Sequence, residues 1–176
     1  MVENHPIEIQ KEGSYVTGLI GALLGALVGA VAWCLVMQLS IIASLVGFVI
    51  GWLAEKGYTL LRGKAGKGKL VILILAVIFG VLAGTFAAHA VDWYKAIAEF
   101  YPNAAITIDG RETLVGYGDI PRLIVYTLQT DSEYLGGTVK DVLMGLLFAF
   151  MGVFGLLKNA AKKPAPKTKT PADPEL

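Results

Sequence analysis

The sequence predicts an all-α membrane protein, with four transmembrane helices in two hairpins and a small extracytoplasmic segment that contains an amphipathic helix. The first observation is composition: apolar residues make up 55% of the 176 residues and charged residues 16%, against about 45–50% and about 25% in a soluble domain. The second is that the apolar residues gather in four blocks, with most charged residues between them. The third is a stripe of small residues along two blocks, which is typical of helices that pack tightly in lipid.

Residues 1–14 form an N-terminal tail that is acidic on balance. The first apolar block follows, and Ala30-Val31-Ala32 within it resembles the cleavage site of a secretory signal peptide. A signal peptide starts with a positively charged region and has a shorter apolar stretch. Cleavage of this block is therefore the disfavoured alternative, and we expect the block to stay as the first transmembrane helix.

Residues 15–61 are expected to form the first transmembrane hairpin, because only the polar break Gln38-Leu39-Ser40 separates two apolar blocks. A helix needs about 20 residues to cross a hydrocarbon core of about 30 Å. The third span is expected over residues 70–91 and the fourth over residues 138–157. Since the fourth block is the shortest, its helix must begin near Gly137, ahead of the apolar stretch.

Lys and Arg are concentrated in the loop at residues 62–69 and in the tail at residues 158–176. The segment at residues 92–137 is instead rich in Asp and Glu. Cytoplasmic loops carry the excess of positive charge, and four spans place both termini on one side. We therefore expect a multi-pass protein of the cell membrane with cytoplasmic N- and C-termini. The tail is rich in Pro and Lys, so we expect it to be disordered.

Aromatic residues fall where the membrane boundaries are expected. The residues near the outer boundary are Trp33, Trp93 and Tyr94, and those near the inner boundary are Tyr15, Trp52 and Tyr58. Trp and Tyr are enriched at both membrane–water interfaces. The distribution therefore predicts two interfacial belts.

The extracytoplasmic segment is expected to contain three elements. A helical extension of the third span should end before Pro102, and the run of residues 105–108 followed by Asp109-Gly110 favours a small hairpin with a tight turn. Asp119 and Pro121 are typical of a helix start. The apolar face that follows consists of Ile120, Leu123, Ile124 and Leu128. We expect this helix to lie on the bilayer surface or to cap the bundle.

The small-residue stripes of the first and third blocks predict helix-packing sites at Gly21, Gly25, Gly29, Gly80 and Gly84. Helices in lipid associate through close backbone approach across such residues. Two stripes exceed what one intramolecular interface needs, so they indicate self-association into a homo-oligomer. Sliding helix interfaces, as in a channel or transporter, are the alternative to static packing.

The loop from Gly63 to Lys69 matches the phosphate-binding pattern G-x-x-x-x-G-K. Leu70 stands where that pattern needs a Ser or Thr to hold magnesium, and a helix rather than a buried strand precedes the loop. We therefore expect a flexible basic loop in which Lys64, Lys67 and Lys69 bind anionic lipid headgroups.

His89 and Asp92 share a face at the outer end of the third block, and Glu55 lies near the inner end of the second. These three residues are the candidate ion or proton sites, with a plain interfacial role as the alternative. Zinc commonly takes four ligands, and no other His lies near His89 and Asp92 in the sequence. We therefore expect no metal. We likewise expect no cofactor and no nucleic acid partner, and the expected partner is the lipid bilayer.

Ser40, Ser44 and His89 are the residues that an intramembrane hydrolase would use. Such an enzyme needs a serine aligned with its base and a group that stabilises the oxyanion. Nothing in the sequence around Ser44 marks it as a nucleophile. We therefore do not expect an enzyme.

Three stretches resemble a family of uncharacterised bacterial four-span membrane proteins. They are Gly21-Ala22-Leu23-Leu24-Gly25-Ala26, then Lys56-Gly57-Tyr58 with Gly63-Lys64, and the run from Asp119-Ile120-Pro121 through Tyr134 into the fourth span. The resemblance covers most of the chain apart from its tails. It implies a four-span fold of this kind and brings no established activity, so it transfers no catalytic residues.

The sequence thus favours a non-enzymatic integral membrane protein that self-associates and acts as a structural or interaction module. A small oligomeric channel or transporter is the alternative. Transport sites usually hold ionisable residues at mid-membrane, and the four blocks have almost none there. A pore gated by an apolar constriction does not need such residues, so the alternative stays open.

Overall fold

The computed structural model describes residues 13–38, 44–99, 105–108 and 111–161. Five α-helices account for most of these residues. They are α1 (Tyr15–Gln38), α2 (Ser44–Leu60), α3 (Lys67–Glu99), α4 (Ile120–Thr130) and α5 (Ser132–Ala161). Two short strands, β1 (Ala105–Ile108) and β2 (Arg111–Leu114), and one turn of 3-10 helix, η1 (Tyr117–Asp119), lie between α3 and α4.

Three helices of the described chain are long and apolar enough to cross a membrane: α1, α3 and the Ser132–Gly155 part of α5. The prediction of a helical, membrane-type architecture is confirmed to this extent, and these helices indicate a membrane protein. The second expected span corresponds to α2, which has 17 residues and a length of about 25 Å. The residues that precede it, 39–43, lie outside the described part, so a fourth span stays a prediction.

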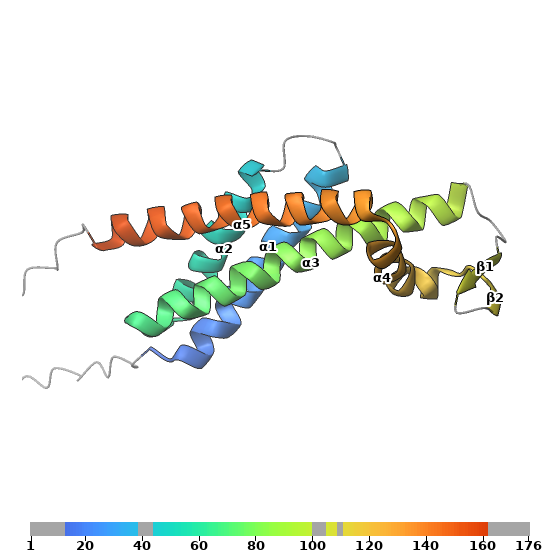
Figure 1. Cartoon of the computed structure of the whole chain (residues 1–176). Coiled ribbons are helices and arrows are strands. Elements are labelled where there is room, and N and C mark those ends of the chain that lie inside the picture. Colours follow the sequence, from blue (N-terminus) through green and yellow to red (C-terminus); the bar gives the residue numbers. More distant parts are fainter. Residues whose placement is uncertain (1–12, 39–43, 100–104, 109–110, 162–176) are drawn as a thin grey trace, which may run out of the picture.

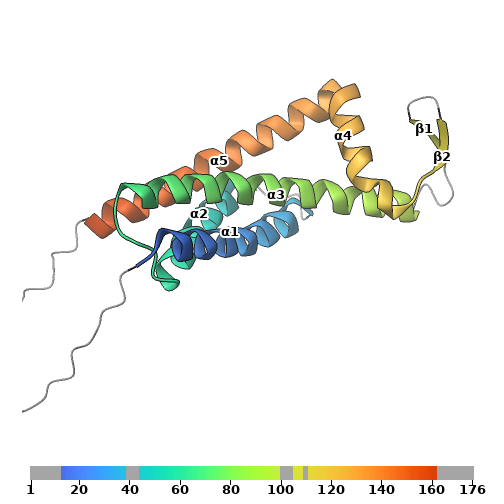
Figure 2. The same ribbon diagram turned by 90° about the horizontal axis from the view of Figure 1, so that it is seen from below.

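Helices α1, α2, α3 and α5 form a bundle in which successive helices run in opposite directions (Figure 1). Helix α1 packs against α2 and α3, while α5 packs against α2 and α3. The start of α1, the connection from α2 to α3 and the end of α5 all lie at one end, here named the basic end because Arg62, Lys64 and Lys67 belong to it (Figures 1 and 2). Helix α3 has 33 residues and extends past the other end of the bundle, where α4 and the hairpin lie (Figure 2).

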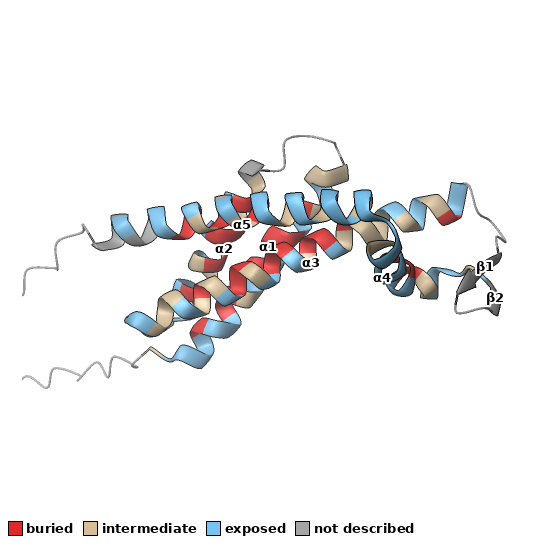
Figure 3. Ribbon diagram, in the orientation of Figure 1, coloured by how far each residue is buried: buried red, intermediate tan, exposed pale blue. Residues whose placement is uncertain are grey.

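The core of the bundle is built largely from small and medium-sized residues on the sides where the helices meet (Figure 3). Its fully buried members include Ala22, Ala26, Trp33, Ile50, Ala54, Tyr58, Ala76 and Ala149. Many larger apolar side chains, such as Leu24, Leu75 and Leu147, are exposed on the outer faces. Exposed apolar surface of this extent marks a surface that water does not cover, which fits helices surrounded by lipid.

The predicted interfacial roles of two aromatic residues are wrong. Trp33 is only 1% exposed and Tyr58 is fully buried, so neither side chain can anchor the chain at a membrane surface. Both fill space that glycines of neighbouring helices leave open. Trp52, Tyr15 and Tyr94 are exposed, as interfacial residues must be.

The segment between α3 and α5 contains two short strands and helix α4. Strands β1 and β2 pair antiparallel, with Ala105 opposite Leu114 and Ile108 opposite Arg111; the predicted turn at residues 109–110 lies outside the described residues. Helix α4 starts between Asp119 and Pro121, with the Pro in its first turn. Ile120, Leu123 and Ile124 are buried in a small cluster with Ile97 of α3. The amphipathic helix therefore packs on the extension of α3.

Two helices are longer than the apolar blocks that predicted them. Helix α3 begins at Lys67, inside the loop expected at residues 62–69, and α5 begins at Ser132 rather than at residue 138. An apolar block marks only the turns that suit hydrocarbon. The backbone hydrogen bonds continue into polar turns on either side, because these turns can extend into water and headgroups.

Candidate functional site

Glycines on α1 hold that helix in backbone contact with α2. A Cβ atom added to Gly21 would overlap the carbonyl oxygen of Gly57, and one added to Gly57 would overlap the carbonyl oxygen of Gly21. One turn along, a Cβ on Gly25 would overlap the carbonyl oxygen of Leu53. At Gly29 it would lie 2.8 Å from the Cα of Ile50. The stripe predicted on the first block is therefore a helix-packing face, and its partner is α2.

The second stripe packs α3 against α1. A Cβ on Gly80 would lie 3.0 Å from the Cβ of Ala26, and one on Gly84 would lie 2.9 Å from the Cδ1 atom of Trp33. Both glycines are buried. All five predicted packing glycines thus lie at contacts within one copy of the chain.

Sequence reasoning missed the glycines that join α2 to α5. A Cβ on Gly47 would lie 2.5 Å from the carbonyl oxygen of Gly145, and one on Gly51 would overlap the carbonyl oxygen of Ala149. On α5, Gly152 lies against the backbone of Phe48, where an added Cβ would be 2.9 Å from its carbonyl oxygen. The signal was present, because Gly47 and Gly51 are four residues apart and Gly145 and Ala149 repeat that spacing.

Tyr58 organises the turn from α2 to α3. Its hydroxyl donates a hydrogen bond of 2.7 Å to the carbonyl oxygen of Lys64, while Gly18 and Gly63 lie against its ring. The N–H of Gly63 donates to the carbonyl oxygen of Tyr58 over 2.9 Å, and Arg62 between them has a positive φ of 54°. A 6→1 hydrogen bond around a left-handed residue is a helix C-terminal cap. The Lys-Gly-Tyr…Gly-Lys element is therefore a structural turn.

Glu55 and Lys69 form an ion pair at the basic end, with 3.0 Å between the Oε1 and Nζ atoms. Their side chains are 13% and 16% exposed, respectively. Lys69 also lies 5.5 Å from the centre of the Tyr58 ring. Glu55 therefore pairs with a lysine of the next helix, and Lys69 is engaged inside the protein. Of the three lysines predicted to meet headgroups, Lys64 and Lys67 are exposed.

His89 lies between α3 and α5. Its Nε2 atom is 3.1 Å from the hydroxyl of Thr138, and its ring centre is 4.8 Å from that of Tyr134. The Thr138 hydroxyl also donates to the carbonyl oxygen of Tyr134 over 2.9 Å. A hydroxyl has one proton to donate, so Thr138 can be the donor in only one of these two contacts.

Asp92 has different partners from His89. Its Oδ1 atom accepts a hydrogen bond of 2.8 Å from Gln38 Nε2, and Lys95 donates to the Oε1 atom of the same Gln38. Gln38 is the last residue of α1, so this cluster ties that helix to α3. Among the residues that the structure describes, no group of three or more His, Cys, Asp and Glu side chains is placed to hold a metal ion.

Of the residues considered for hydrolysis, Ser40 lies outside the described residues and Ser44 begins α2. The described partners of His89 are Thr138 and Tyr134.

Comparison with protein-family models, with curated proteins and with solved structures gives no match for this chain. The resemblance to a bacterial four-span family stays a prediction carried by the quoted residues. The class that the fold itself indicates is a helical membrane protein, on the strength of three helices able to cross a bilayer.

Proposed function

We propose that this chain is an integral membrane protein with four spans and cytoplasmic termini, which works as a non-enzymatic structural or interaction module. The observation that carries the proposal is the set of glycine contacts that joins α1 to α2 and α3, and α2 to α5. These glycines are used in contacts between helices of one copy, and large apolar side chains lie on the outer faces of the bundle. Outer faces of this kind interact with lipid or with other helices.

The glycine contacts change the expected basis of self-association. Gly21, Gly25 and Gly29 contact α2, while Gly84 contacts α1 and Gly80 contacts both α1 and Ile50 of α2. A homo-oligomer therefore has to form through other faces of the bundle. The exposed apolar residues of α5, among them Leu143, Leu147 and Met151, offer one such face.

The proposed four-span topology is tested by labelling single cysteines in intact cells. In a Cys34→Ser background, Ala65→Cys reports on the α2–α3 connection and Gly118→Cys on the segment before α4. Both positions are exposed, and Gly118 has no atom within 4 Å of an added Cβ, so neither change should disturb the fold. We expect a membrane-impermeant maleimide to label Gly118→Cys but to reach Ala65→Cys only after permeabilisation. Labelling of both from the same side would eliminate the topology.

A channel or transporter is the second candidate, and two polar residues of α3, His89 and Asp92, favour it. Histidine and carboxylate side chains within apolar helices mark proton and ion pathways in many transporters. Proton flux into liposomes that depends on the protein, and that is lost in His89→Gln, would support transport. The proposed module predicts no flux above that of liposomes without protein. Tyr126→Phe, at an exposed position on α4, is the neutral control and should match the unchanged chain.

A further inference from the structure

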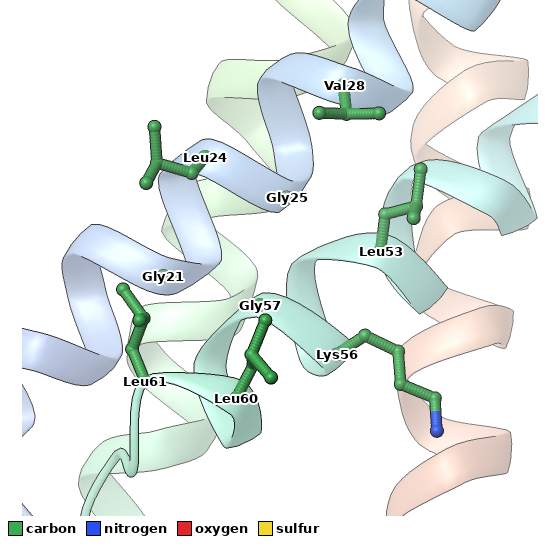
Figure 4. A pocket seen from close by; sticks show the side chains of 9 residues that line it. All are labelled: Gly21, Leu24, Gly25, Val28, Leu53, Lys56, Gly57, Leu60 and Leu61. Atoms are coloured by element: carbon green, nitrogen blue, oxygen red, sulfur yellow. The ribbon is translucent and has the colours of Figure 1, made fainter.

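An open groove of about 410 Å³ runs along the outer side of the α1–α2 contact (Figure 4). Gly21, Gly25 and Gly57 form its floor, and leucine and valine side chains from both helices form its walls. The groove exists because glycines bring two backbones together while their neighbours project outward. Leu24 and Val28 on the α1 side are both exposed, so the groove opens to the surroundings of the bundle.

Lys56 is the charged residue that lines this otherwise apolar groove. Its side chain extends from α2 away from Leu60 and Leu61 (Figure 4), and Lys56 lies about one helical turn before the end of α2 at the basic end of the bundle. The nitrogen lies 5.8 Å from the ring centre of Trp52. Glu55, the neighbouring carboxylate, is paired with Lys69, so within the described part of the chain Lys56 keeps an unneutralised positive charge.

We propose that the groove binds one acyl chain of an anionic phospholipid, whose phosphate pairs with Lys56. This inference rests on the membrane location proposed above. A lysine whose stem lies along apolar surface and whose ammonium group reaches the interface is placed to meet a lipid phosphate. The basic end adds Arg62 and Lys64 to the same side of the membrane, which raises the local concentration of anionic lipid.

The depth of the groove fits a chain from one leaflet. On α1 the groove extends from Gly21 to Val28, about 10 Å along the axis, and Val28 lies about 20 Å from the start of the helix. These positions fall largely within the half of the hydrocarbon core nearest the basic end, which is about 15 Å thick. An acyl chain anchored by its phosphate at the level of Lys56 therefore runs alongside the glycine floor.

The lining favours an acyl chain of a phospholipid over a helix of a second copy. The groove is apolar apart from Lys56, and a lipid phosphate pairs with that lysine, whereas an apolar helix face leaves it unpaired. An extended hydrocarbon chain is narrower and can lie between the Leu24 and Leu61 side chains. The acyl chain also supplies dispersion contacts that the glycine floor lacks when the groove is empty.

Native mass spectrometry of the full chain, released from nanodiscs with equal phosphatidylglycerol and phosphatidylcholine, tests the proposal. We expect one retained phosphatidylglycerol for each copy. Lys56→Gln should lower that retention about fivefold, because one lysine near the membrane surface contributes about 1 kcal/mol, while Lys56→Arg should keep it. Lys64→Gln removes a charge from the same end outside the groove, so it should lower retention less than Lys56→Gln does. Equal losses for Lys56→Gln and Lys64→Gln would show diffuse attraction and overturn the site.

A second pair of variants tests the groove itself. Val28→Trp fills its inner part and should lower the retention of both lipids, whereas Val31→Trp, one turn away and outside the groove, should not. The two valines are 61% and 62% exposed, so they are matched in surroundings. Unchanged lipid retention in Val28→Trp overturns the proposal. The proposal is also overturned if Val28→Trp lowers the mass of an oligomer instead of the lipid retention, because the groove would then bind a second copy. A chain outside the membrane would instead retain neither lipid in any variant and would fail the cysteine labelling.

Discussion

Gly21 of α1 and Gly57 of α2 face each other so closely that neither position has room for a Cβ atom, because each would overlap the carbonyl oxygen of the other. The contact is reciprocal, and Gly25 extends it by a turn against Leu53. Helix association in lipid depends on packing of this kind. The α1–α2 pair is therefore the most tightly specified contact of the bundle, and it is the one that forms the floor of the groove.

Gly25→Leu should destabilise the fold of a single copy. The new side chain meets the backbone of Leu53 and Ala54, and backbone cannot move aside as a flexible side chain can. We expect a loss of about 3 kcal/mol, the upper part of the range for overpacking, measured as a lower unfolding midpoint in detergent.

Gly136→Leu is the matched control for Gly25→Leu, since an added Cβ there has no atom within 4 Å. Its midpoint should stay the same or rise, because Leu favours a helix more than Gly does. If Gly25→Leu changed only the size of an oligomer and left the unfolding midpoint intact, the intramolecular role of the stripe would be refuted.

Tyr58→Phe should cost about 1 kcal/mol, the usual contribution of one hydrogen bond. The change removes the hydroxyl that donates to the carbonyl oxygen of Lys64 and leaves the ring packed against Gly18 and Gly63. Thermal unfolding in mild detergent measures the effect. Tyr126→Phe, at an exposed position, should leave the midpoint unchanged, and an equal shift in both variants would rule out a special role for the turn.

The ion pair between Glu55 and Lys69 should show measurable coupling in a double-mutant cycle. Both side chains are mostly buried, and hydrogen bonds to charged groups contribute about 1.5–3 kcal/mol. Glu55→Gln and Lys69→Met should therefore each destabilise the protein, while the double variant should lose less than the sum of the two. Lys67→Met, at an exposed lysine, should show no coupling to Glu55→Gln. Strictly additive losses for Glu55 and Lys69 would contradict the pairing.

The sequence predicted the helices of this protein better than their partners. Apolar blocks identify α1, α3 and α5 because a bilayer selects long apolar stretches. The five glycines of the two stripes lie at close helix contacts, but the sequence does not tell which face meets which helix. Two stripes indicate self-association as long as one intramolecular interface is assumed. The structure uses both stripes inside one copy, because α1 packs against both α2 and α3.

Other parts of the site depend on contacts between residues far apart in the chain. Glu55 and Lys69 are separated by 14 positions and meet only because the turn around Tyr58 brings α3 back along α2. Trp33 was expected at a membrane boundary because of its position in the block. Its burial depends on Gly84 of α3 and Gly145 of α5. These two glycines leave space for the indole ring of Trp33.

Thr85 and Thr138 should respond in opposite directions to the same substitution. Thr85 is buried on α3, and its hydroxyl has no hydrogen-bond partner within the described structure, so Thr85→Val removes a buried polar group that nothing satisfies. An isosteric replacement of this kind should raise stability by about 1 kcal/mol. Thr138→Val removes a hydroxyl that contacts His89 and the carbonyl oxygen of Tyr134, and it should lower stability by a similar amount. The measurement is the unfolding midpoint of each variant compared with that of the unchanged chain. A shift of the same sign in both variants would mean that the hydrogen-bond partners of the hydroxyl do not determine the change in stability at these positions.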